Sequence, residues 1–217
     1  MAIQEKYSKL LRQIVEAATA VGIYDRMFLA FGSLLGSVRP TKNITTGEFR
    51  RGVMSHDHDM DVGFLDSVTA ADSEAYFAEC GRRGLMDCWA SPASRVTRRG
   101  PDNRIIWFSV KAEDRGVKCC QWFMFEHHGF LWHGKAGRPN WTTDGVQSVK
   151  GIRADYFANL VEIEFEGVKI LAPEMAGSTL DSWYPGWHIP AGGCSSKKVL
   201  CKIPNWSDRS QWRILGA

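Results

Sequence analysis

The sequence lacks the patterns that mark several common protein classes. It has six cysteines among 217 residues, but no CxxC pair and no Cys/His spacing of a zinc site. Its longest apolar stretch, Met27 to Val38, is too short to span a bilayer, and the N-terminus has no apolar segment typical of a signal peptide. We therefore expect reduced thiols and a cytoplasmic protein without stable membrane insertion.

The sequence also lacks a strong charge of either sign. The formal net charge is +3, and lysine and arginine are spread along the chain, so we do not expect a nucleic-acid partner. We find no internal repeat and no low-complexity tract. The hydrophobic content of 44% and charged content of 24% are ordinary for a globular protein, and 217 residues suit one domain, which we expect to span 1–217.

Hydrophobic periodicity predicts both helices and strands, and hence an α+β fold with a β-rich C-terminal part at 150–217. Glycines after residues 21 and 83 favour helix ends there, and the chain after Pro173 is rich in proline and glycine, which predicts a loop-rich tail. The expected helices are 6–21, 34–38 and 70–83, and the expected strands are 27–31, 59–64, 104–112, 117–126, 130–133, 160–165 and 168–171.

Two aspartates are the main candidates for chemistry. Asp59 and Asp61 stand two residues apart on a predicted strand, so their side chains project from one face and can hold a hard cation such as Mg²⁺ or Mn²⁺. Gly32 and Ser33 follow the preceding apolar strand, where a turn of small residues lets backbone N–H groups approach a phosphate. Arg39 adds a planar donor suited to phosphate oxygens.

The neighbouring histidines do not convert this pattern into a zinc site. His56 and His58 precede Asp59, as in the H-x-H-x-D-H pattern of binuclear zinc hydrolases. However, Met60 stands where that pattern requires an aspartate, and Asp61 stands where it requires a histidine. The spacing therefore favours hard-cation phosphate chemistry.

These residues resemble a known family. The stretch 31–39, FGSLLGSVR, followed by 56–63, HDHDMDVG, is similar to the LicD/fukutin-type branch of the nucleotidyltransferase fold, with its G-[TS]-L-L-G-x-x-R motif and later D-x-D. The segments FEG at 165–167, AP at 172–173 and LDSWYPGWHIP at 180–190 resemble the ending of such domains. The resemblance covers about residues 6 to 190 in the expected order, with core motifs at 27–64. It implies a nucleotidyltransferase-like mixed β-sheet flanked by helices.

The resemblance implies a transferase that moves a phosphate-linked alcohol, such as phosphocholine or ribitol phosphate, from a cytidine diphosphate donor to a glycan or another hydroxyl acceptor. Asp59 and Asp61 match the family's catalytic, metal-binding acids. Gly32 and Ser33 match its donor-phosphate turn, and Arg39 matches its post-turn arginine. The implied cofactor is Mg²⁺ or Mn²⁺.

The chain departs from the family at a later strand. Family members usually carry a further acid there, and Gln121 stands at the matching position, which makes it a candidate substrate-binding residue. Either Glu126 or Asp57 takes the acid's role, or activity is altered. Two alternatives stay open: transfer of a nucleoside monophosphate to a small molecule, and a nucleotide-binding module without catalysis.

Overall fold

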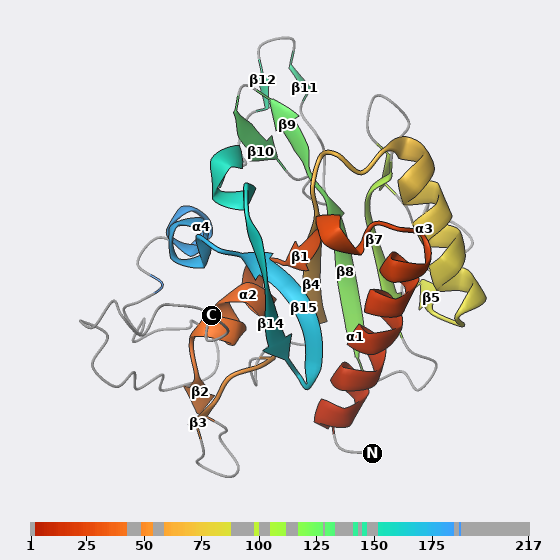
Figure 1. The fold of residues 1–217 in the computed structure, drawn as a ribbon, viewed down its shortest axis with the longest axis vertical. Helices are drawn as coiled ribbons and strands as arrows, with labels where there is room; N and C mark the ends of the chain where they lie inside the picture. Colours follow the sequence, from red (N-terminus) through yellow and green to blue (C-terminus); the bar gives the residue numbers. More distant parts are fainter. Residues whose placement is uncertain are drawn as a thin grey trace.

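A six-stranded mixed sheet forms the centre of the computed structural model (Figure 1). The strand order is β1-β4-β8-β7-β5, and β6 also pairs with β7. The β4–β8 pair is parallel, while β1–β4, β7–β8 and β5–β7 are antiparallel. The strands are β1 (Met27–Leu29), β4 (Asp59–Phe64), β5 (Met86–Asp87), β6 (Arg98–Arg99), β7 (Ile105–Lys111) and β8 (Lys118–Phe123). The structure describes residues 3–42, 49–53, 59–87, 98–99, 105–111, 117–127, 129–132, 141–142, 145–146, 152–184 and 187.

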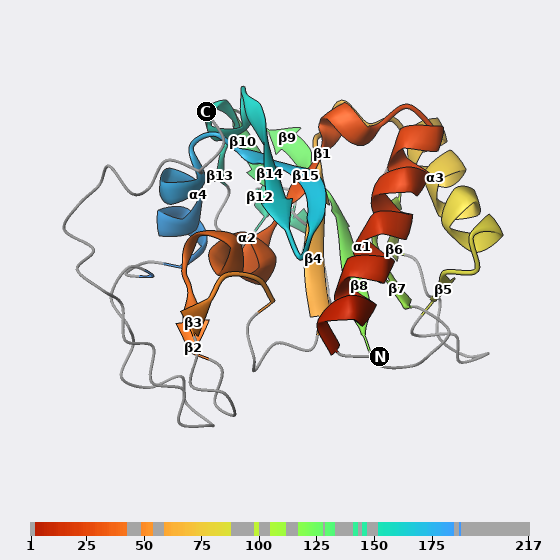
Figure 2. The ribbon, with the colours of Figure 1, turned by 60° about the horizontal axis from the view of Figure 1, so that its bottom comes forward.

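Helices α1 (Ile3–Ala20) and α3 (Ala70–Arg82) lie side by side over one face of this sheet (Figure 2). We call it the core face, because it carries the apolar residues of the central strands, including Met60, Val62, Phe64, Phe108 and Phe123. Leu10, Leu11 and Ile14 of α1 are fully buried against it. The 3.6-residue spacing of apolar side chains in α1 therefore has the packing role that it predicts.

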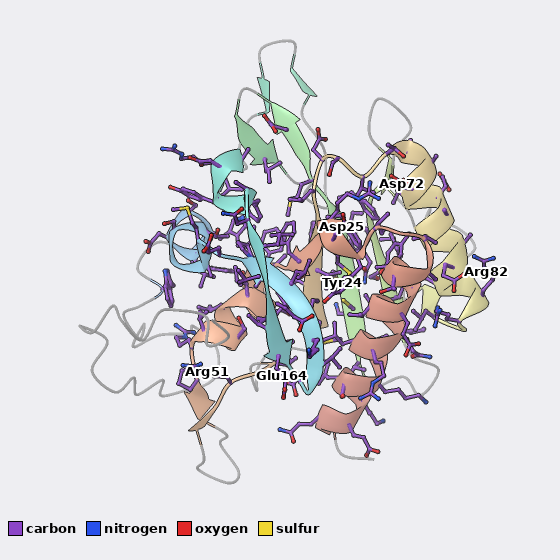
Figure 3. The ribbon with its side chains drawn as sticks, viewed as in Figure 1. Tyr24, Asp25, Arg51, Asp72, Arg82 and Glu164 are labelled. Carbon is purple, nitrogen blue, oxygen red and sulfur yellow. The ribbon has the colours of Figure 1, made fainter. Side chains whose placement is uncertain are left out.

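Helix α3 begins at a capping box. The Thr69 hydroxyl accepts a hydrogen bond from the Asp72 N–H at 3.1 Å, and the Asp72 carboxylate accepts one from the Thr69 N–H at 3.0 Å. The turn η1 (Tyr24–Arg26) lies beside this helix start, and Arg26 Nη1 is 3.0 Å from Asp72 Oδ2 (Figure 3, where Asp25 and Asp72 are labelled). These bonds fix the start of α3 relative to η1, which leads directly into β1.

A separate hairpin, β14 (Leu160–Phe165) with β15 (Val168–Pro173), packs beside β1 and α1 and extends the core-face cluster. Its turn uses positive φ values at Glu166 (50°) and Gly167 (73°), the region that a tight hairpin turn requires. The strand predictions for both arms are confirmed.

The opposite face of the sheet carries a smaller apolar cluster that includes Phe28, Met124 and Phe157. Helices α2 (Phe31–Val38) and α4 (Ala176–Trp183) are in contact with each other (Figure 1). The remaining elements are β2 (Thr41–Lys42), β3 (Phe49–Arg50), β9 (Phe125–His127), β10 (Phe130–Trp132), β11 (Trp141–Thr142), β12 (Gly145–Val146), β13 (Ile152–Arg153) and η2 (Ala154–Phe157).

The observed architecture confirms a mixed α/β fold with a mixed sheet and flanking helices. The prediction of a loop-rich tail after Pro173 is wrong for one segment. Residues 176–183 form α4 instead of a loop, although Gly, Ser and Thr are weak helix formers, because Ala176 and Leu180 are buried in the core. Residues 113–116, between the expected strands 104–112 and 117–126, and most of 134–149 lie outside the described residues. Among the helices that the structure describes, none has the length and apolarity needed to cross a bilayer.

Candidate functional site

The candidate site begins at the junction of β1 and α2. Here the chain turns directly from a buried strand into a helix, and Phe31 takes a φ of 44°, which is uncommon for a residue with a Cβ. Gly32 and Ser33, which the sequence predicts as the turn, instead lie in the first turn of α2 and are buried. The tight turn thus exists, one residue earlier than predicted.

Ser33 joins α2 to the aspartate strand. Its hydroxyl oxygen accepts a hydrogen bond from the backbone N–H of Asp61 at 2.8 Å. The Asp61 carbonyl accepts a second bond, from the Ala30 N–H, at 3.1 Å. The two bonds occupy both the backbone N–H and the carbonyl of Asp61, and the structure thereby brings the Gly32-Ser33 segment and the D-x-D pair together.

Asp59 and Asp61 lie on the sheet face opposite α1 and α3, which we call the site face. Strand pairing sets nine residues of β4, β8 and β7 in three rows across it. The first row is Asp59, Lys118 and Lys111; the second is Asp61, Cys120 and Ser109; the third is Gly63, Trp122 and Trp107. From the first row to the third, the site face therefore changes from three charged side chains, to a carboxylate with a thiol and a hydroxyl, and then to a glycine with two aromatic rings.

Strand β8 supplies direct partners to both carboxylates. Lys118 Nζ lies 3.0 Å from Asp59 Oδ2, and the Cys120 thiol donates to the same oxygen at 3.6 Å. Trp122 Nε1 donates to Asp61 Oδ1 at 2.8 Å. Sequence reasoning missed these three residues. Their alternation with Cys119 and Gln121 was the available signal, but either set could face the site until the partner strands were known.

Gln121 is the candidate that the structure does not bring to the aspartates. It lies on the core face and is fully buried; its amide oxygen accepts a hydrogen bond from the Tyr76 hydroxyl at 3.0 Å, and its amide nitrogen donates to the Cys119 carbonyl at 3.4 Å. The reason is the two-residue period of a strand, which points Gln121 away from its neighbours Cys120 and Trp122. The β8 residue level with Asp61 on the site face is Cys120.

Arg39 ends α2 and is directed into the protein. Only 7% of its surface is exposed, and its Nη1 donates to the Trp187 carbonyl at 3.0 Å. In this geometry Arg39 connects α2 to the segment after α4. Glu126, a substitute considered for the missing acid, is exposed on β9, and Asp57, His56 and His58 lie outside the described residues.

The thiols near the carboxylates are protonated groups. Burial raises the pKa of the Cys120 thiol, and the negative charges of Asp61 and Asp59 raise it further. Burial likewise raises the pKa of Cys119 on the core face. Cys120 therefore acts toward Asp59 as a neutral hydrogen-bond donor.

The residues present fit a cation that takes most of its ligands from water and substrate. Both aspartates are partly exposed on one strand face, and a carboxylate has capacity for several bonds, so the two donors to Asp59 Oδ2 and the Trp122 donor to Asp61 Oδ1 leave room for coordination. Mg²⁺ commonly binds one or two carboxylates and completes its shell with water and substrate phosphates. Among the described residues, no group of three or more His, Cys, Asp and Glu side chains is arranged around one metal position.

Aromatic side chains border Asp61. The Phe31 ring lies 5.2 Å from the Trp122 ring and 4.4 Å from the Trp183 ring, measured between centroids. The Trp122 indole that donates to Asp61 is thereby held by packing as well as by its hydrogen bond. Rigid support of this kind fixes the direction of the Asp61 carboxylate.

The chain was compared with known protein families and with curated proteins. No family model matches it, and no curated protein matches it. Any functional assignment therefore depends on the motifs of the sequence and on the geometry of the site face.

Proposed function

We propose that this protein is a metal-dependent transferase that moves a phosphate-linked group from a nucleotide-diphosphate donor to a hydroxyl acceptor. The observation that carries the proposal is the Ser33–Asp61 hydrogen bond of 2.8 Å, which joins the two halves of the motif resembling the LicD/fukutin-type family. A chance D-x-D on a solvent-facing strand needs no such connection to a Gly-Ser helix start.

Each residue has a distinct part in this proposal. Asp59 and Asp61 bind Mg²⁺ or Mn²⁺, which when bound neutralises charge on the donor phosphates. Ser33 holds the Asp61 backbone, and Trp122 orients its carboxylate. In-line transfer at phosphorus depends mainly on positioning and charge stabilisation, so a site without a covalent nucleophile suits it. The phosphate-linked alcohol and a glycan acceptor follow from the resemblance alone.

A non-catalytic nucleotide-binding module is the second candidate function. The observation that favours it is the row of β8 side chains on the site face, Lys118, Cys120 and Trp122, which contains no acid. A protein with two carboxylates can bind a metal–nucleotide complex without activating an acceptor hydroxyl. The two candidates differ in turnover and agree in binding.

A doubly labelled donor tests the proposal. A CDP-linked alcohol carrying one isotope in the nucleoside and another in the alcohol is incubated with Mg²⁺ or Mn²⁺ and candidate hydroxyl acceptors. We expect the alcohol phosphate on the acceptor and free CMP. Transfer of the nucleoside half instead indicates a nucleotidyltransferase, and tight binding without transfer of either half indicates the binding module.

A further inference from the structure

Lys118 and Asp59 form an ion pair inside the candidate metal site. Lys118 begins β8 and stands level with Asp59 across the parallel β4–β8 pair, and its Nζ lies 3.0 Å from Asp59 Oδ2. The two side chains keep 35% and 25% of their surface exposed, respectively, so solutes reach both. An ammonium group therefore already neutralises one of the two carboxylates that the proposed function assigns to the metal.

The surroundings of Lys118 indicate that this pair is exchangeable. The Lys118 side chain is partly exposed, so water can replace the carboxylate as the partner of its ammonium group. Lysine also has a flexible stem that carries its charge to more than one partner. Asp61, in contrast, is held at its backbone by Ser33 and at its carboxylate by Trp122.

We propose that Lys118 is a built-in counter-cation of Asp59 that competes with the divalent metal for the carboxylate and so sets the metal affinity. This inference depends on the proposed metal-dependent function. With a divalent ion held by Asp59 and Asp61, the Lys118 ammonium would leave Oδ2 of Asp59. It would then bind the anionic oxygens of the donor diphosphate. Lys118 thus couples metal binding to donor binding.

The inference predicts an unusual direction of effect: removing Lys118 strengthens metal binding. Calorimetric titration with Mn²⁺ alone is performed on the full chain and on its Lys118→Met, Lys118→Gln and Lys118→Arg variants. We expect about two- to fivefold tighter Mn²⁺ binding for the Met and Gln variants, the size set by a partly exposed ion pair, and near wild-type affinity for the Arg variant. Lys111→Met is the matched control, since it removes the same charge one strand further from Asp59.

A second titration measures the coupling. With CDP present, wild-type protein should bind Mn²⁺ more tightly than without it, and Lys118→Met should lose much of this gain because its side chain cannot bind phosphate oxygens. Thermal unfolding confirms that each variant is folded. Agreement between Lys118→Met and Lys118→Gln excludes a defect that belongs to one replacement alone.

The outcomes separate this inference from the proposed function. Wild-type protein that binds no Mn²⁺ overturns both. Wild-type protein that binds Mn²⁺, while Lys118→Met and Lys118→Gln bind it equally or more weakly, overturns the role of Lys118 and leaves the metal site standing. An equal gain for Lys111→Met reveals a general charge effect and also overturns the contact-specific role.

Discussion

The Ser33 hydroxyl accepts a hydrogen bond from the Asp61 backbone N–H at 2.8 Å. Through this bond a buried helix start supports the strand that carries both candidate metal ligands. The two residues are 28 positions apart in the chain, so only the tertiary fold brings them together.

Ser33→Ala removes this acceptor and leaves the Asp61 N–H without it. Losing one partner of a partly buried hydrogen bond costs about 1 kcal/mol, so we expect a fall of that size in the free energy of unfolding, with weaker Mn²⁺ binding. Urea denaturation and Mn²⁺ titration measure the two effects. Ser37→Ala is the control on the same helix, since the Ser37 hydroxyl donates to the Leu34 carbonyl instead. Equal Mn²⁺ affinities for the two variants contradict the supporting role of Ser33.

Cys120→Asp puts a third acid level with Asp61. Without metal, repulsion among three carboxylates lowers stability; with Mg²⁺, the added ligand raises the affinity. We therefore expect the rise in unfolding temperature on adding Mg²⁺ to be larger than in wild-type protein, because ligand binding stabilises the folded state. Cys120→Asn, of similar size but neutral, is the control. If both variants gain the same from Mg²⁺, Cys120 does not face the metal position.

Gly63 allows the Phe28 ring to lie directly on β4. A Cβ added at residue 63 would be 2.4 Å from Phe28 Cζ, and Phe28 is fully buried, so the ring cannot move into solvent. Overpacking of this kind costs about 1–3 kcal/mol, and we expect Gly63→Ala to be destabilised by that amount in urea denaturation. Phe28→Leu in the same chain should recover part of the loss. A Gly63→Ala variant as stable as wild type contradicts this packing.

Alkaline pH should destabilise the protein through its buried thiols. Burial, the largest cause, raises the pKa of Cys80 from 9.0 to about 12, and burial also raises the pKa of Cys119. Between pH 9 and 12 the unfolded chain has lost the Cys80 proton while the folded chain keeps it, so the free energy of unfolding falls as pH rises. Cys80 alone lowers the free energy of unfolding by up to about 1.4 kcal/mol per pH unit in this window.

Urea denaturation at several pH values measures that slope. Cys80→Ala should show a shallower decline than wild type, whatever its stability at neutral pH. Slopes that match within error contradict a buried, protonated Cys80.

The helices and strands of this fold could largely be predicted from the sequence. Which side chains of β8 point to the site face could not. The alternation of Asp59-Met60-Asp61-Val62 has acids on one side and apolar groups on the other, so its two faces are unambiguous. Strand β8 has a cysteine and an aromatic ring on each side, so only its pairing with the partner strands shows which side faces the site. Gln121 was expected at the site because it matches the family's further acid, and the alternation of β8 could not show that this position faces the core.

Helix α4 was missed for a different reason. Several of its residues have low helix propensity and the segment closely follows a proline, while the burial of Ala176, Thr179 and Leu180 stabilises the helical form. Similarly, the salt bridge between Lys118 and Asp59 joins residues on separate strands, which no local pattern indicates.

The central claim is that Asp59 and Asp61 hold a divalent cation. The most direct test is calorimetric Mn²⁺ titration of Asp59→Asn and Asp61→Asn, with Asp25→Asn, an exposed acid of η1, as the charge-matched control. We expect Mn²⁺ binding by wild-type protein and by Asp25→Asn, and binding at least about tenfold weaker in each site variant. Unchanged Mn²⁺ affinity in Asp59→Asn and Asp61→Asn would contradict it.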